Sequence, residues 1–398
     1  MRLFSNLHSH EAEQLFYLQP STFNKNSSPD LLSYCLGATL YMPATKPNIH
    51  QDIISNKHAG LTSLVICLED AIGDDQVELA EGMLIKELRD LYDGLQKGFI
   101  QLEELPLIFI RIRSKEQFER LAFILEETLS VITGIVIPKF SVHTGRPILE
   151  QIVELNGRGN NLYAMPILET KSIIYKETRV QELYEIKNLL DQFKDHILNV
   201  RIGATDFSGL FGIRRKSDTT VYDIAVIRDC ISDIINMFVR FDCPYVVSGP
   251  VWEYFSSKER VLKPQIRETP FREKYGQVGV DWRKELIGHQ LDGFIKEILM
   301  DISNGLVGKT IIHPTHINPV QALNVVTYEE YIDALNIVDQ HNGNLGVIKS
   351  SFSNKMNEFK PHYYWANKIL LKSKVYGVLR DEYTYIDLLK QESYFTHY

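Results

Sequence analysis

Short apolar runs of strand length alternate along the chain with longer segments in which apolar residues recur at helical spacing. The interiors of the short runs are almost continuously hydrophobic, which is typical of parallel strands that are covered on both faces. Eight runs are predicted as strands: 38–43, 63–69, 107–113, 134–139, 162–169, 199–205, 245–251 and 309–313. The order of strands and helices therefore indicates a repeated βα unit.

The segments between these runs carry apolar stripes that predict amphipathic helices. One stripe follows the second run, another the fifth run and a third the sixth run. The third stripe consists of Ile224, Ile227, Ile231, Ile234 and Phe238. Thr220, with Asp223 three residues later, has the form of a capping box in front of it. All three stripes are expected to pack against a core.

Eight strands that alternate with helices fit an α/β fold of the (β/α)8 TIM-barrel type, with a doubly wound open sheet as the alternative. The barrel domain is predicted over 36–345, between an N-terminal extension (1–35) and a C-terminal helical extension (346–398). A polar segment with Pro and Gly, at about 256–282, predicts a long loop over the active face.

Composition excludes several classes of function. The 398 residues include 43 Lys and Arg against 51 Asp and Glu, a net charge of −8, which gives no basic surface for nucleic acid or for an anionic membrane. The apolar runs are far shorter than the ~20 residues of a transmembrane helix. The four cysteines are widely spaced and the N-terminus has no secretory pattern, so we expect a cytoplasmic protein.

Ionisable residues stand at the ends of most predicted strands, where a barrel places its chemistry. They are Glu69 and Asp70, Arg111 and Arg113, Lys139, Glu169, Asp206 and His313. A barrel brings these ends into one pocket, where unpaired like charges are costly unless a cation binds between them.

Glu169 and Asp206 end neighbouring strands and are the candidate metal ligands. Two carboxylates with open coordination positions suit Mg²⁺, which keeps several waters. Glu69 and Asp70 are candidates for holding those waters. Arg111 offers a planar donor fork for a substrate carboxylate or a developing enolate oxygen, so Arg111, Glu69 and Asp70 are the candidate catalytic residues.

A basic run precedes the helix that follows the sixth strand. Arg214 and Arg215 stand near a predicted helix N-terminus, which suits a phosphate or a carboxylate, but a solvated basic loop accounts for them equally well. Together with Arg111 and Lys139 they form the candidate substrate-binding set.

Six short motifs occur in order along the predicted barrel. They are LEDA (68–71), FIRIR (109–113), IPK (137–139), PILET (166–170), IGATDF (202–207) and GKTIIHP (308–314). On these motifs the chain resembles the citrate lyase beta-subunit-like enzymes, also called the HpcH/HpaI aldolase family, which are Mg²⁺-dependent C–C bond lyases of TIM-barrel fold. The loop before the last strand and the tail also resemble a divergent branch of the family associated with tellurium-resistance gene clusters.

The resemblance implies that Glu169 and Asp206 bind Mg²⁺, that Arg111 contacts the substrate, and that Glu69 and Asp70 support the metal waters. Four positions depart from the family pattern, which often has Asp at Cys67, Asn at Arg113, Gly directly after the ET motif, where this chain reads KSI, and Glu at Thr205. These departures predict a changed substrate pocket on a retained metal site.

The expected function is a Mg²⁺-dependent carbon–carbon lyase or aldolase that acts on a 2-keto acid or an acyl-CoA-type carboxylate through an enolate. The alternatives are an acyl-CoA thioesterase on the same scaffold and a non-catalytic binding or assembly subunit. The expected partner is a small-molecule keto acid or acyl-CoA, without nucleic acid or membrane. The aromatic tail around Tyr363–Leu370, together with the resemblance, predicts a homo-oligomer, either a trimer or a hexamer.

Overall fold

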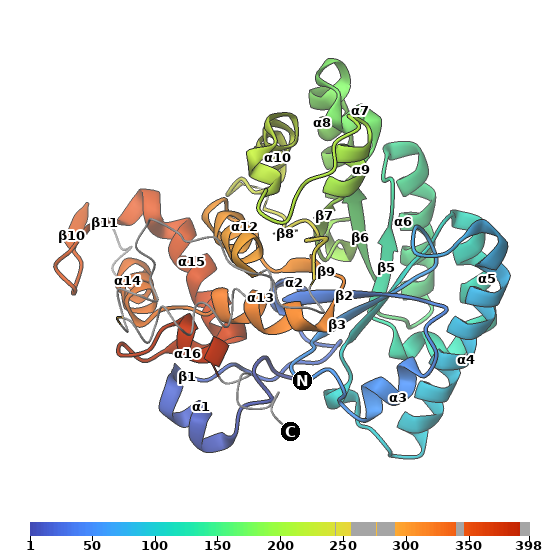
Figure 1. Cartoon of the computed structure of the whole chain (residues 1–398), viewed down its shortest axis with the longest axis horizontal. Helices are drawn as coiled ribbons and strands as arrows, with labels where there is room; N and C mark the ends of the chain where they lie inside the picture. Colours follow the sequence, from blue (N-terminus) through green and yellow to red (C-terminus); the bar gives the residue numbers. More distant parts are fainter. Residues whose placement is uncertain (243, 256–275, 277–290, 340–345, 391–398) are drawn as a thin grey trace.

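The computed structural model of the chain describes residues 1–242, 244–255, 276, 291–339 and 346–390 (Figure 1). The predicted long loop at 256–282 lies outside the described residues apart from position 276. None of the helices in the described part of the chain combines the length and the apolarity needed to span a membrane.

Eight parallel strands form one sheet in the order β8-β7-β6-β5-β4-β3-β2-β9. They are β2 (Ala38–Pro43), β3 (Ser63–Cys67), β4 (Leu107–Arg111), β5 (Gly134–Ile137), β6 (Tyr163–Leu168), β7 (Val200–Ile202), β8 (Val247–Ser248) and β9 (Lys309–Ile311). A parallel bridge between Gly249 and Lys309 joins the two ends of this order. The barrel prediction is therefore confirmed, and the open-sheet alternative is wrong.

All strands except β2 end earlier than the sequence pattern predicts. The run predicted over 199–205, for example, ends at Ile202, because the next helix begins at Ala204. The residues beyond each strand form the turns that carry polar side chains. The pattern of apolar residues indicates which residues are buried, but it does not indicate where the hydrogen bonds between neighbouring strands end.

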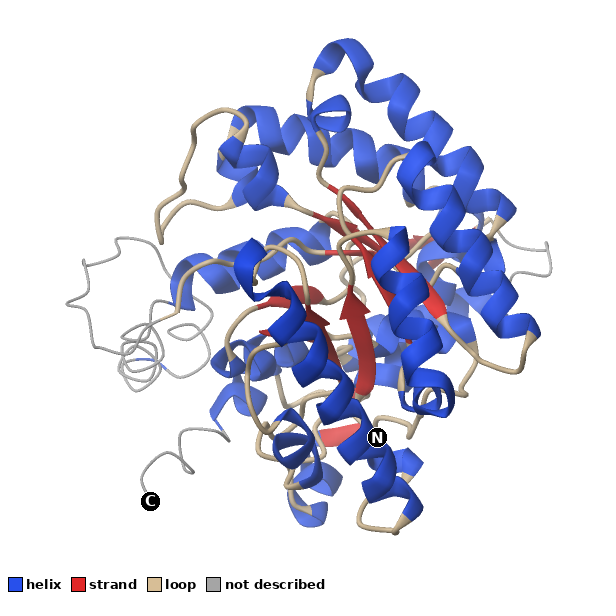
Figure 2. Cartoon of the chain, turned by 90° about the vertical axis from the view of Figure 1, so that its right-hand side faces the viewer, coloured by secondary structure: helices blue, strands red, loops and turns tan. Residues whose placement is uncertain are grey.

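Helices surround the strands, as Figure 2 shows. They are α3 (Ile49–Ile54), α4 (Val77–Gln96), α5 (Lys115–Leu125), α6 (Val142–Gly157), α7 (Lys171–Ile174), α8 (Lys176–Gln192), α9 (Ala204–Gly209), α10 (Ala225–Phe238), α12 (Leu291–Ser303) and α13 (Ile317–Leu323). The three predicted stripes lie on α4, α8 and α10 and are mostly buried. The predicted capping box is present, but it opens the short 3-10 turn Val221–Asp223 that precedes α10.

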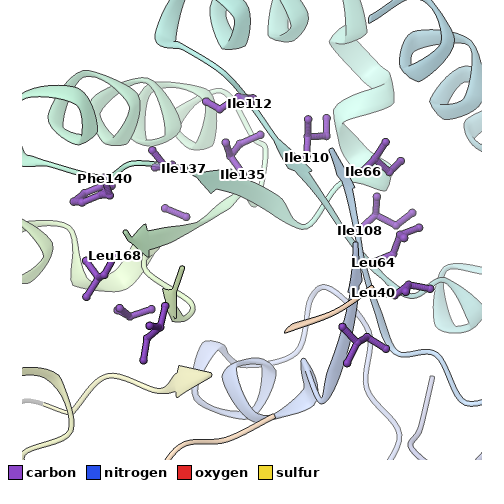
Figure 3. Close-up of a cluster of buried hydrophobic side chains, with 14 of the residues drawn as sticks. Leu40, Leu64, Ile66, Ile108, Ile110, Ile112, Ile135, Ile137, Phe140 and Leu168 are labelled. Atoms are coloured by element: carbon purple, nitrogen blue, oxygen red, sulfur yellow. The ribbon is translucent and has the colours of Figure 1, made fainter. Parts of the chain in front are cut away.

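Side chains on the two faces of the strands belong to two hydrophobic clusters. Leu64, Ile66, Ile108 and Ile110 point outward and pack under the helices (Figure 3). The alternate residues point into the barrel, among them Val65 and Phe109 in the second cluster. Both faces are thus covered, which explains why these strands have continuous rather than alternating hydrophobic sequences.

A segment near the N-terminus pairs with one near residue 378. Strand β1 (Phe16–Leu18) pairs antiparallel with β12 (Val378–Leu379). The N-terminal residues Leu3 and Phe4 join the cluster that fills the barrel interior. The remaining elements are α1 (Ser9–Leu15), α2 (Pro29–Cys35), α14 (Tyr328–Asp339), β10 (Val347–Lys349), β11 (Met356–Glu358), α15 (Phe359–Tyr376) and α16 (Tyr385–Lys390).

The C-terminal segment contains short strands as well as helices. Its longest helix, α15, packs on α14, with Ile369 and Ala366 against Ala334 and Ile337. Ala366 and Ile369 are thus buried within the chain, while Tyr363, Tyr364 and Trp365 are partly exposed, and the oligomer stays a prediction. The division at residues 35 and 345 stays a prediction.

Candidate active site

Four charged side chains meet at the carboxyl ends of β3, β4 and β5. Lys139 Nζ contacts the Glu69 carboxylate and lies 3.3 Å from Asp70 Oδ1. Arg111 Nη1 lies 3.4 Å from Glu69 Oε2 and 3.4 Å from Asp70 Oδ2. Each carboxylate thus bridges both cations. We call Glu69, Asp70, Arg111 and Lys139 the mouth quartet.

A turn lets the consecutive residues Glu69 and Asp70 face the same cations. The Ile72 amide donates to the Glu69 carbonyl at 2.8 Å, and the Asp70 amide donates to Glu69 Oε2 at 2.9 Å. Partial burial opposes ionisation of Asp70, but its contacts with Glu69, Arg111 and Lys139 outweigh burial and lower its pKa. Asp70 is therefore an ionised carboxylate at neutral pH.

The Arg111 guanidinium is fixed on several sides. Its Nε donates to Cys67 Sγ at 3.2 Å, and its central carbon lies 5.5 Å from the centre of the Tyr41 ring. Only 12% of the Arg111 side chain is exposed. Cys67, which also accepts a hydrogen bond from the Glu69 amide at 3.3 Å, is therefore more than core packing. The sequence pattern gave no signal for Tyr41 beyond its place in a strand.

Glu169 follows β6 and is almost fully buried. The Lys139 amide donates to Glu169 Oε1 at 2.7 Å, and Lys139 adopts a positive φ of 45°, which is unusual for a residue with a side chain. Gly203 packs so closely that a Cβ added there would lie 2.2 Å from Glu169 Oε2. The backbone on both sides therefore sets the position of this carboxyl group.

Asp206 lies in the first turn of α9, and its side chain interacts with that of Glu169. Burial, followed by the charge of Asp206, raises the pKa of Glu169 to about 8. Burial and then the charge of Asp70 raise the pKa of Asp206. The charge of Asp206 opposes ionisation of Glu169, while the hydrogen bond between the two side chains favours the ionised form of Asp206, so the pair shares a proton unless a cation replaces it.

The chemistry of this pair fits a hard divalent cation such as Mg²⁺, for which two carboxylates and several waters are a common ligand set. Within the described residues, no three or more His, Cys, Asp and Glu side chains are grouped so that they could hold a metal ion. A metal bound by Glu169 and Asp206 would therefore keep positions open for water and substrate.

Arg215 is not available to a substrate in this structure. Its Nη1 lies 2.5 Å from Glu297 Oε2, its guanidinium stacks on Trp252, and its side chain is 3% exposed. Arg214 is exposed and lies beside it in the sequence. The basic run therefore divides into a buried structural cation and a surface residue, and only Arg214 stays a candidate for substrate binding.

His313, at the end of β9, does not join the mouth quartet. Its ring stacks on that of Phe255, with the ring centres 4.6 Å apart and the planes within 6°. Trp252 is fully buried and packs against the Arg215 guanidinium.

Comparison with known proteins gives a family. The family model described as "C-C_Bond_Lyase of the TIM-Barrel fold" matches residues 30–378. No curated protein sequence matches the chain.

Solved structures with a similar fold are distant. Protein CitE from Mycobacterium tuberculosis, in complex with magnesium, acetoacetate and coenzyme A, is 16% identical over 85% of this chain and 97% of its own, with a TM-score of 0.47. A citrate lyase beta subunit from M. tuberculosis, complexed with oxaloacetate and magnesium, is 17% identical over 73% and 96% (TM-score 0.43). Malate synthase from Haloferax volcanii is 10% identical over 71% and 72% (TM-score 0.48).

Proposed function

The chain belongs to the C–C bond lyases of the TIM-barrel fold, and from that membership we propose that it is a Mg²⁺-dependent lyase or aldolase. Its substrate would be a 2-keto acid or an acyl-CoA-type carboxylate, and the reaction would pass through an enolate. The observation that carries the proposal is the Glu169–Asp206 pair beside the mouth quartet.

Charge balance supports a metal at the pair. The mouth quartet holds two cations and two carboxylates, so it is close to neutral by itself. Among the described residues, neither Glu169 nor Asp206 forms an ion pair with a cationic side chain. A divalent cation would supply the charge that these two carboxylates lack, and they are the ligands we propose for Mg²⁺.

Each protein group has a role that follows from its contacts. The metal, when bound, would polarise the substrate carbonyl as a Lewis acid. Arg111, held by Cys67 and Tyr41, would bind the substrate carboxylate or the enolate oxygen without needing to reorganise. Glu69 and Asp70 would orient waters at the metal and keep Arg111 in place. Lys139, with 53% of its side chain exposed, would offer a second cation to the substrate.

Two other functions would use the same residues. A thioesterase would release a free thiol without breaking a carbon–carbon bond, and a binding subunit would bind ligand without turnover. The strained backbone at Lys139 and the paired carboxyl groups argue for catalysis, because such features cluster at working active sites. The tellurium-resistance branch, a cytoplasmic location and a trimer or hexamer also stay proposals.

The test is calorimetric titration of Mg²⁺ into the wild type, followed by a turnover screen with keto acids and acyl-CoAs. Product analysis separates carbon–carbon cleavage from thioester hydrolysis. Asp229→Asn, at a half-exposed position of α10, is a control for the loss of one carboxylate. Absence of Mg²⁺ binding in the presence of a keto acid would refute the lyase proposal.

A further inference from the structure

Arg113 is an active-site neighbour that the proposed chemistry does not use directly. We propose that it is a positioning residue, which holds the turn after β3 so that Glu69 and Asp70 both reach Arg111 and Lys139. Its effect on catalysis rests on the proposed function, but its effect on the mouth quartet does not.

The Arg113 guanidinium donates hydrogen bonds to the backbone of the turn, before Glu69 and after Asp70. Its Nε donates to the Leu68 carbonyl at 2.7 Å, and its Nη2 donates to the Ile72 carbonyl. Its Nη1 lies 2.7 Å from Asp74 Oδ1, but the Asp74 side chain is 96% exposed. An ion pair with so exposed a partner contributes little, so the two carbonyl contacts carry the interaction.

The turn needs these hydrogen bonds because the side chains of Glu69 and Asp70 point to the same side. Consecutive residues of an extended strand face opposite sides, whereas Glu69 and Asp70 both contact Lys139 and Arg111. Two adjacent carboxylates also repel each other. The planar fork of Arg can donate to two carbonyl groups at once, which the single ammonium of Lys cannot do in the same geometry.

Arg113 is itself held from the helical layer. Its backbone amide donates to Gln117 Oε1 at 2.7 Å, and Gln117 Nε2 donates to Glu81 Oε1 at 2.8 Å. Gln117 lies on α5 and is buried, while Glu81 lies on α4. The turn is thus tied to the helices α4 and α5.

The reactivity of Lys139 reports the geometry of the quartet without any substrate. Lys139 Nζ contacts the Glu69 carboxylate and lies 3.3 Å from Asp70 Oδ1, and an amine held by two carboxylates reacts more slowly with an acylating reagent than a free amine. We therefore expect slow acylation of Lys139 in the wild type, measured by peptide mass spectrometry relative to the exposed Lys86. Arg113→Lys keeps the charge but loses the double contact, and should raise the relative rate about tenfold.

Asp74→Asn is the matched control, because it removes only the exposed ion pair and should leave the rate within about twofold of wild type. Arg113→Gln is a second variant, which can donate to only one of the two carbonyl groups and should also raise the rate. An unchanged Lys139 rate in both Arg113 variants would overturn the proposal. So would a rise shared by all lysines together with a lower melting temperature, since that indicates a general loss of stability.

The catalytic consequence is measured separately. Glu169 follows β6 and Asp206 lies on α9, away from the turn after β3, so Mg²⁺ affinity should be the same in Arg113→Lys and the wild type. The kcat/KM for a keto acid should fall about tenfold through substrate positioning. A wild type without turnover would refute the proposed function, while the acylation result would still decide the role of Arg113. Faster Lys139 acylation in Arg113→Lys with unchanged kcat/KM would overturn the catalytic part.

Discussion

Two clusters in this molecule are built from the same four residue types, and they differ in what surrounds them. The mouth quartet has one Glu, one Asp, one Arg and one Lys, and two of its side chains are about half exposed. A second cluster, which we call the buried quartet, consists of Arg215, Glu297, Asp301 and Lys309, with every side chain at most 3% exposed.

The charged groups of the buried quartet are paired with one another. Lys309 Nζ lies 2.9 Å from Glu297 Oε1 and 2.6 Å from Asp301 Oδ2, and Arg215 occupies the other oxygen of Glu297. The hydroxyl of Tyr222 donates to Asp301 at 2.7 Å. All four carboxylate oxygens are therefore engaged, and the cluster fastens β9, α12 and the segment before α10 to one another.

The mouth quartet differs because uncompensated charge lies beside it. Glu169 and Asp206 add two carboxyl groups and no cation, and their pKa values are raised. A buried cluster in which every carboxylate oxygen has a partner contributes to structure. A cluster near solvent, beside carboxylates that have no cationic partner, is suited to binding a ligand. The four residue types alone do not distinguish the two cases.

The largest expected loss of stability comes from a substitution in the buried quartet. Glu297→Ala leaves Arg215 and Lys309 as buried cations without their shared partner, which should cost about 3–5 kcal/mol of the free energy of unfolding. Urea denaturation followed by circular dichroism measures the loss.

The matching change at the mouth is Asp70→Asn, because Asp70 also bridges two cations. Its side chain is 47% exposed, so the loss should be below about 1 kcal/mol. Equal losses in the two variants would contradict the distinction between a structural and a functional quartet.

The next effect concerns the metal pair. Asp206→Asn removes one of two charged ligands, so Mg²⁺ affinity should fall at least about a hundredfold, while the fold is retained because Asp206 is only partly buried. Calorimetry and thermal melting test both parts. Unchanged Mg²⁺ affinity in this variant would remove Asp206 from the site.

Arg111→Lys should separate substrate binding from metal binding. A point charge does not reproduce the guanidinium that contacts Cys67, Glu69 and Asp70, so keto-acid affinity in the presence of Mg²⁺ should fall about tenfold. Mg²⁺ affinity itself should stay near the wild-type value. A parallel fall of both affinities would show that Arg111 organises the metal site instead.

The smallest effect is a pH dependence. The pKa of Glu169 is raised to about 8, so a proton competes with Mg²⁺ below that pH, and the apparent affinity should fall by up to about tenfold per pH unit. Without metal, the folded state binds the proton more tightly than the unfolded chain. Stability should therefore decrease as the pH rises from about 4.5 to about 8.

Calorimetry in buffers with different ionisation enthalpies should show that Mg²⁺ binding releases protons. Affinity that is flat between pH 6 and pH 8, a range that lies wholly above ordinary carboxyl pKa values, would contradict a shared proton at the pair.

Several features of the fold and site could be predicted from the sequence because they depend on local patterning. The eight strands follow from apolar runs, and Glu69, Asp70, Arg111 and Lys139 meet because a parallel barrel gathers its strand ends. Strand ends were overestimated, since an apolar residue such as Ile202 is followed by site residues that are also partly buried.

Other features depend on partners that are distant in sequence. Arg215 was a candidate for substrate binding because its neighbours are basic, but its partner Glu297 lies 82 residues further along the chain. The acceptor role of Cys67 and the ring of Tyr41 under Arg111 likewise require three strands to be placed side by side. No periodicity in the sequence carries that information.

The central claim is that Glu169 and Asp206 together form the metal site. Mn²⁺ suits the same oxygen ligands as Mg²⁺ and gives an anomalous X-ray signal, so a crystal soaked in Mn²⁺ tests the claim directly. The account predicts one anomalous peak per chain within about 2.2 Å of an oxygen of each of these two carboxylates. A peak at the mouth quartet instead, or none in the presence of a keto acid, would contradict it.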